Sequence, residues 1–132
     1  MPITQTFTAS RNATWAPPLT YTYPGGALPL AGAKVAMQLR LYPGAAGDPL
    51  LAIPEIAYTD VRIAAASGDR DELRRLTLMP EFAPTQLSTL PNSGEAGDSD
   101  TFAFDILIIY ADGVTEILSS GSFIVSPGVT RP

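Results

Sequence analysis

The stretch FDILIIYADGVTEILSSGSFIV, residues 104–125, decides the fold of this chain. It holds two β-rich runs on either side of Asp112-Gly113, a dipeptide typical of tight hairpin turns. A two-residue type I′ turn at this dipeptide fixes the register of the whole hairpin. The predicted pairs are Tyr110 with Thr115, Ile108 with Ile117 and Phe102 with Phe123.

The two faces of this hairpin carry different expectations. In the predicted register, one face is apolar and should anchor the core; it holds Phe102, Phe104, Ile106, Ile108, Ile117 and Phe123. The opposite face holds Leu107, Ile109 and Leu118, and it is more apolar than a solvated sheet surface requires. We therefore expect these three residues to be covered by another subunit.

Short β-rich runs recur through the rest of the chain, separated by many of its 13 prolines and 11 glycines. The predicted strands are residues 3–9, 19–23, 33–42, 49–54, 58–66 and 73–79. Pro84, with Leu87 and Leu90 three residues apart, predicts one or two helical turns near residues 84–90. About seven or eight short strands with one helical turn predict an immunoglobulin-like antiparallel β-sandwich.

Chain length favours a single domain over residues 1–132. Residues 92–100, NSGEAGDSD, are polar and are expected to form an exposed loop. Residues 1–12 are expected to contain an edge strand or to extend as an N-terminal arm.

Composition excludes several classes of function. The formal net charge is −5, and the chain has no basic stripe to neutralise phosphates, so nucleic acid is not an expected partner. Cysteine and histidine are both absent, which excludes thiolate chemistry and a Ser/His/Asp triad. No segment resembles a signal peptide or a membrane span, so we expect a protein used without classical secretion.

The remaining candidates for chemistry are carboxylates. Glu95, Asp98 and Asp100 could serve a carboxylate-based hydrolase or bind a cation, although a solvated loop explains them more simply. Asp105 lies within the strongest strand, either as an outward carboxylate or paired with an arginine on a neighbouring strand. We expect no catalytic residue, no metal and no cofactor.

Three aromatic residues near the N-terminus form a separate candidate. Trp15, Tyr21 and Tyr23 flank Pro17-Pro18, and such side chains can line a surface that binds glycans. Packing in the core or at a sheet edge explains the same residues. These three aromatics are therefore candidate interface residues, together with Leu107, Ile109 and Leu118.

The order of three segments resembles a known family. The segments are LPLAGAKVAMQLRLYPG at 28–44, LRRLTLMPEFAPTQLSTLP at 73–91 and FAFDILIIYADGVTEILSSGSFIVSPGVTR at 102–131. In this order they resemble small tailed-phage virion proteins that are similar to the N-terminal domain of the siphophage upper baseplate protein family.

This resemblance implies a structural role in a virion that is assembled in the bacterial host cytoplasm. Such a protein would dock on the tail tip, the baseplate or the fibre base through contacts with other phage structural proteins, in several symmetric copies. The alternative within the virion is a capsid decoration or head–tail connector protein. Neither reading involves a membrane.

Overall fold

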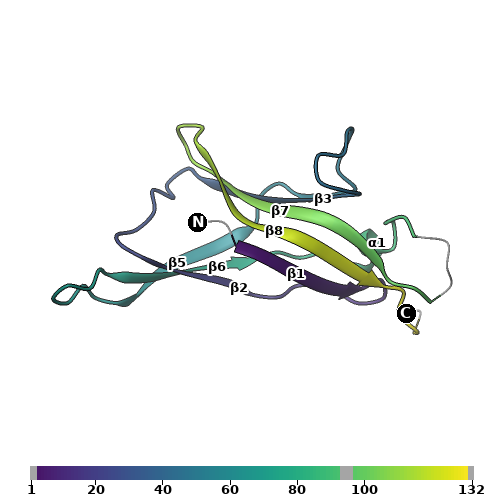
Figure 1. Cartoon of the computed structure of the whole chain (residues 1–132), viewed down its shortest axis with the longest axis horizontal. Helices are drawn as coiled ribbons and strands as arrows, with labels where there is room; N and C mark the ends of the chain where they lie inside the picture. The colour runs from purple at the N-terminus through teal and green to yellow at the C-terminus, as the bar shows by residue number, and fades with distance from the viewer. Residues whose placement is uncertain (1–2, 93–96, 131–132) are drawn as a thin grey trace.

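The hairpin of residues 100–126 forms two inner strands of the larger of two sheets (Figure 1). The computed structural model describes residues 3–92 and 97–130. Within them lie eight strands: β1 (Ile3–Ser10), β2 (Leu19–Pro24), β3 (Lys34–Arg40), β4 (Leu51–Ile53), β5 (Ala57–Ala64), β6 (Leu73–Met79), β7 (Asp100–Ile109) and β8 (Thr115–Ser126). One sheet has the order β1-β8-β7-β3-β4 and the other β2-β6-β5. The predicted all-β sandwich is confirmed.

The predicted helical turn is also confirmed, as the short helix α1 (Pro84–Leu87). Proline stands at its start, where the missing N–H group costs nothing. Its buried side chain is Leu87, and Leu90 just beyond it is buried as well. This one-sided burial agrees with the spacing of the two leucines.

Residues 3–10 belong to the sheet rather than to an extended arm. They form β1, an edge strand that pairs with β8, and the pairing is parallel. This one pair departs from the antiparallel pairing predicted for the sandwich, which the other strand pairs of the described residues follow. Parallel neighbours require a long connection, and here nearly the whole chain lies between the two strands.

The predicted type I′ turn at Asp112-Gly113 was wrong. Tyr110 donates its main-chain N–H to the carbonyl of Val114 and accepts from Gly113, which makes a three-residue loop of residues 111–113. Gly113 has a φ of +91°, and Asp112, like every other described non-glycine residue, keeps a negative φ. A type I′ turn would require a positive φ at Asp112, which is strained for a residue with a side chain. A type I turn followed by a left-handed glycine avoids that strain. The Asp112 carboxylate also accepts from the N–H of Val114 (2.9 Å).

A β-bulge then restores the predicted pairing farther along the hairpin. Leu107 pairs with Ile117 but Ile106 pairs with Ser119, which leaves Leu118 as the extra residue. Near the turn, Ile108 faces Glu116 instead of Ile117. Beyond the bulge, Phe102 pairs with Phe123 as predicted.

The core lies between the two sheets. Its larger members come from the inner faces of β3, β6, β7 and β8 and from the segment around α1: Val35, Met37, Leu39, Leu76, Leu78, Phe82, Leu87, Phe102, Phe104, Ile106, Ile108, Phe123 and Val125. Alternation along these strands leaves their other faces outside the sandwich.

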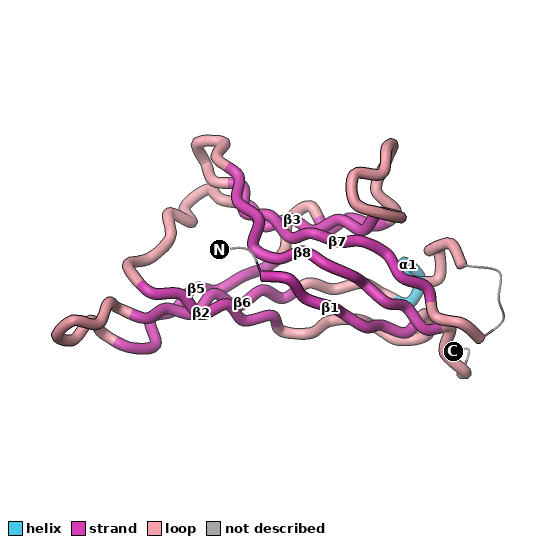
Figure 2. Tube along the Cα trace, in the orientation of Figure 1, coloured by secondary structure: helices cyan, strands magenta, loops and turns pink. Residues whose placement is uncertain are grey.

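The two ends of the sandwich differ in shape. At one end the β5–β6 and β7–β8 hairpins diverge and leave the segment 25–33 between them; the other end holds α1 and the C-terminus (Figures 1 and 2). Of the predicted polar loop at 92–100, residues 93–96 lie outside the described part of the chain, and Asp100 is the first residue of β7.

Candidate functional site

The aromatic candidates near the N-terminus do not form a common surface. Trp15 is only 7% exposed and Tyr21 only 6%. The Trp15 ring lies 4.9 Å from Phe123 and 5.6 Å from Phe82, centroid to centroid. Its main chain also exchanges two hydrogen bonds of 2.9 Å with Phe82. Trp15 is thus core, as the simpler alternative had it, and cannot present a face to a glycan.

Tyr21 closes a polar contact inside the sandwich near the β1 edge. Its hydroxyl donates to Oε1 of Gln5 (3.2 Å), which also accepts from the fully buried Ser119 hydroxyl (2.6 Å). Burial raises the pKa of the Tyr21 hydroxyl, and the Ser119 hydroxyl partly opposes that rise. The three side chains satisfy one another, so this cluster joins β1, β2 and β8 and leaves no group for a ligand.

The apolar candidates on β7 and β8 divide between the two faces. Leu107 is half-buried and Ile109 is 36% exposed on the outer face, as expected. Leu118 instead packs against the core, because the bulge turns it inward, so its assignment to the outer face was wrong. Ile117, predicted to lie in the core, takes its place outside and is 46% exposed.

We call Leu107, Ile109 and Ile117 the outer patch. Leu107 and Ile117 are direct cross-strand neighbours, and Ile109 lies two residues farther along β7 toward the turn. Most outward positions farther along β8 and β1 hold small hydroxyl side chains: Ser120, Ser122, Thr4, Thr6 and Thr8, with Ile124 opposite Thr8. The outer face of the larger sheet thus joins an apolar end to a more polar end.

A shallow groove of about 460 Å³ lies on the polar part of this face. Gln38 and Arg40 of β3, Asp105 of β7 and Ser120 of β8 line it. Arg40 donates to the carbonyls of Ala45 (2.9 Å) and Gly47 (2.7 Å), and so holds the loop after β3 over the groove.

Asp105 lies outward within this groove. Burial raises the pKa of its carboxyl, and the charge of Arg40 acts in the opposite direction. No ion pair to Asp105 occurs among the described residues, so Arg40 attracts this carboxylate without a direct bridge. Each of the two interpretations from the sequence, an outward carboxylate or a carboxylate beside an arginine, therefore describes a part of the environment of Asp105.

The acidic loop candidates are not brought together. Asp98 is exposed and Glu95 lies outside the described residues. Asp100 forms an ion pair with Arg11 (3.1 Å). Within residues 3–92 and 97–130, no group of three acidic, histidine or cysteine side chains is placed to hold a metal ion.

Arg11 is a residue that sequence reasoning missed. Its guanidinium donates to the carbonyls of Leu87 (3.2 Å), Leu90 (2.6 Å) and Pro91 (2.9 Å), besides Asp100. These bonds tie the end of β1 to the last residue of α1 and to the segment just after it. An isolated arginine after a strand gives no sequence signal for partners 76 to 89 residues away.

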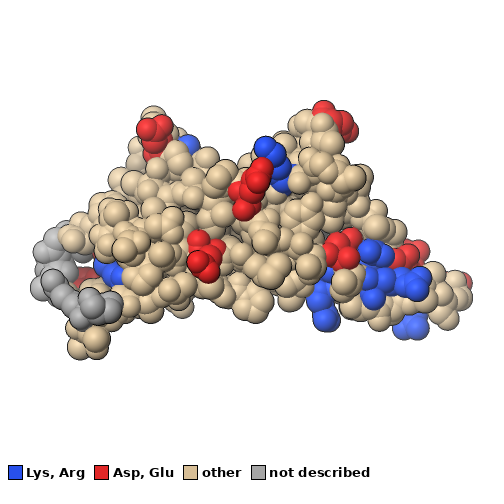
Figure 3. Space-filling model, turned by 180° about the vertical axis from the view of Figure 1, so that it is seen from behind, with Lys and Arg blue, Asp and Glu red and all other residues tan. Residues whose placement is uncertain are grey.

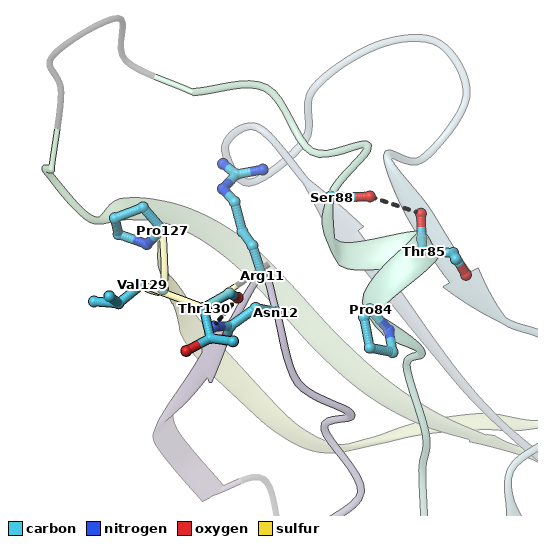
Figure 4. Close-up of a pocket in the computed structure, with 9 residues that line it drawn as sticks. Arg11, Asn12, Pro84, Thr85, Ser88, Pro127, Val129 and Thr130 are labelled. Atoms are coloured by element: carbon cyan, nitrogen blue, oxygen red, sulfur yellow. Dashed lines mark hydrogen bonds between the residues drawn. The ribbon is translucent and has the colours of Figure 1, made fainter. Parts of the chain in front are cut away.

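Arg11 borders a surface cavity of about 600 Å³ between α1 and the C-terminal segment (Figure 4). Asn12 lies on the same side and donates to the carbonyl of Thr130 (2.7 Å), which fixes that segment. Pro84, Thr85 and Ser88 of the α1 segment form the opposite wall. The cation of Arg11 is occupied by its internal partners, so the cavity offers a ligand mainly small neutral groups.

The other end of the sandwich carries a denser polar cluster. The Tyr23 hydroxyl lies 2.8 Å from both oxygens of Asp60, which also pairs with Arg74 (3.3 Å). Arg74 is held in addition by Glu72 (2.7 Å), and that bond is the main cause that raises its pKa. Burial, with a smaller contribution from Asp60, raises the pKa of Tyr23. Tyr23 is thus a bridge between β2 and β5 and not a free aromatic face.

A second groove of about 460 Å³ opens beside this cluster, and we call it the hairpin groove. It lies between the segment after β2 and the β7–β8 turn, and it is lined by Leu28, Pro29, Ala31, Tyr110, Ala111, Asp112, Val114 and Glu116. Glu116 accepts from the Tyr110 hydroxyl (3.3 Å). The groove therefore has apolar walls with two carboxylates at its hairpin side.

Comparison with known proteins gave no relative: no protein-family model matches the chain, and no curated protein matches it. None of the described helices is both long enough and apolar enough to cross a membrane. The surfaces described above are thus the basis for a functional conclusion.

Proposed function

We propose that this chain is a non-enzymatic structural subunit of a tailed-phage particle, which docks on the tail tip, baseplate or fibre base. The observation that carries the proposal is the outer patch of Leu107, Ile109 and Ile117 on the outer face of the larger sheet. Apolar side chains grouped on an open sheet face are typical of surfaces that another protein covers.

The family resemblance supplies the second support. It rests on the order of three segments, the last of which is the hairpin that carries the outer patch. Repetition of such a patch around a symmetric particle would turn many weak contacts into firm attachment. The partner surface is then that of another phage structural protein.

The geometry does not favour the glycan-binding alternative, because Trp15 and Tyr21 are buried and Tyr23 is bonded to Asp60. It does not favour a hydrolase either, since Asp100 is paired with Arg11 and Asp98 is exposed. A capsid decoration or connector role remains the second candidate, because it would use the same outer patch.

The test is to locate a tagged copy of the chain in purified particles by electron microscopy. Label at the tail is the expected result, and label on the capsid would replace the tail assignment by the head alternative. Absence of the chain from particles would refute the proposal.

A matched pair of variants tests the patch itself. Ile117→Asp should lower the amount of chain incorporated into particles, whereas Met79→Asp should not. Met79 on β6 of the smaller sheet is 46% exposed, as Ile117 is, and lies outside the patch, so it controls for a charge added to an exposed apolar position. Equal incorporation of the two variants would contradict docking through the outer patch.

A further inference from the structure

The outer half of the β5–β6 hairpin, residues 61–75, is a projecting element, and we call it the arm. It extends past the end of the larger sheet (Figure 1), and every residue from 61 to 71 is exposed. Two of its large apolar side chains face solvent, Val61 at 49% exposure and Ile63 at 38%. Such side chains on a projection indicate a contact with another molecule more strongly than isolated ones on a flat surface.

The arm is also where basic side chains gather. Four of the eight lysine and arginine residues lie in it: Arg62, Arg70, Arg74 and Arg75. Figure 3 shows the corresponding concentration of basic side chains at one end of the molecule. Only Arg74 is neutralised by neighbours; the side chains of Arg62, Arg70 and Arg75 make no ion pair or hydrogen bond with the described residues.

The hairpin groove is complementary to the arm in both respects. Leu28, Pro29 and Val114 give it apolar walls, and Asp112 and Glu116 give it negative charge without an ion pair among the described residues. A volume of about 460 Å³ admits a few side chains rather than a whole strand. An apolar side chain of the arm with an arginine beside it fits these limits.

Arm and groove lie at the same end of the sandwich, where the two hairpins diverge (Figures 1 and 2). A two-fold axis beyond that end would therefore bring each arm against the groove of the other copy. We propose that two copies of this chain associate in this way, with Val61 and its cross-strand neighbour Arg75 of each arm against Val114, Asp112 and Glu116 of the partner groove. Asp69 and Asp71 lie at the tip, beyond the arginine that makes this contact.

Charge reversal on either side tests the contact. Sedimentation equilibrium of the whole chain should show a dimer that weakens as salt is added. The arm variant Arg75→Glu and the groove variant Asp112→Arg/Glu116→Arg should each weaken association at least about tenfold, as expected for loss of close charge pairs. Glu81→Arg, an exposed site near α1, is the control for added positive charge and should not change association.

A mixture of the two variants is the most specific test of the contact. In a mixed dimer, the acidic arm of one variant meets the basic groove of the other, and the two unchanged surfaces meet each other. Mixing should therefore restore dimers that neither variant forms alone. The change sites are exposed, and circular dichroism would confirm that each variant is folded.

Three results would overturn the proposal. The wild-type chain could stay monomeric at the highest concentration its solubility allows. Its dimer could be unaffected by both reversals, which would place the contact elsewhere. Finally, the mixture could remain monomeric although both variants are folded.

Discussion

Gly121 on β8 is predicted to be the position least tolerant of a side chain. It pairs with Gln5 of the edge strand β1 and has a φ of +151°, a conformation that side chains disfavour. A Cβ at this position would overlap the main-chain carbonyl of Gln5. Gly121→Ala should therefore push β1 away from β8 in the middle of their register.

The size of the effect follows from two contributions. The unfavourable φ costs about 1 kcal/mol by itself. Displacement of β1 also disturbs the packing of Phe7, which lies 4.7 Å from Phe104 between ring centroids, and loss of such burial costs about 2 kcal/mol. For a chain of this size, a total of about 3 kcal/mol lowers the unfolding temperature by roughly 12 °C.

Gly47→Ala is the matched control. Gly47 has a φ of +88° but nothing within 4 Å of the added carbon, so it carries the backbone cost alone. By thermal unfolding followed by circular dichroism, we expect Gly47→Ala to lose about 4 °C. Hydrogen exchange should show loss of protection in β1 for Gly121→Ala only. An unfolding temperature for Gly121→Ala equal to that of the control would refute the assigned β1–β8 contact.

Three further predictions address single contacts. Leu118→Asn should lower the free energy of unfolding in urea by about 2 kcal/mol, whereas Ile117→Asn changes it by less than about 0.5 kcal/mol; equal losses would contradict the bulge. Arg11→Met should lower the free energy of unfolding by about 2 kcal/mol and expose the α1 segment to proteolysis, because Arg11 donates to three carbonyls and to Asp100. Arg62→Met should do neither, because the Arg62 side chain makes no ion pair or hydrogen bond with the described residues. Burial raises the pKa of Asp105 above its ordinary value in the folded chain, so its ionised form destabilises the fold at higher pH and the effect fades as pH falls through that range. Asp105→Asn should thus raise the unfolding temperature at pH 7 and match wild type in acid; an unchanged temperature at pH 7 would disprove this.

Alternation of apolar and polar residues was sufficient to predict most strands. Val35, Met37 and Leu39 recur with period two and all three are buried in β3. The strands at 58–66 and 73–79 and the proline-started helical turn were likewise predicted from local signals. These features depend on neighbours close in sequence, which the sequence displays directly.

The features that sequence reasoning missed depend on distant partners. Arg11 gains its role only because β1 ends beside α1, and the parallel partner of β1 lies at the other end of the chain. Trp15 could have lined a surface or a core, and only the position of Phe123 and Phe82 decides that it is core. The arm is another example, since its exposure depends on how far the larger sheet extends above it.

The register of the β7–β8 hairpin shows how one residue determines a surface. A two-residue turn would have buried Ile117 and exposed Leu118, but the longer turn shifts the near half of β8 by one position. The bulge at Leu118 reverses that shift before Phe123 reaches the core, so both ends of the hairpin keep a buried face. The exchange leaves the β-branched Ile117 beside Leu107 on the outer face and places Leu118, which is branched at Cγ instead of Cβ, against the core. An exposed apolar patch and a filled core thus arise from the same inserted residue, which is why the Ile117 and Leu118 variants should separate the proposed assembly from stability.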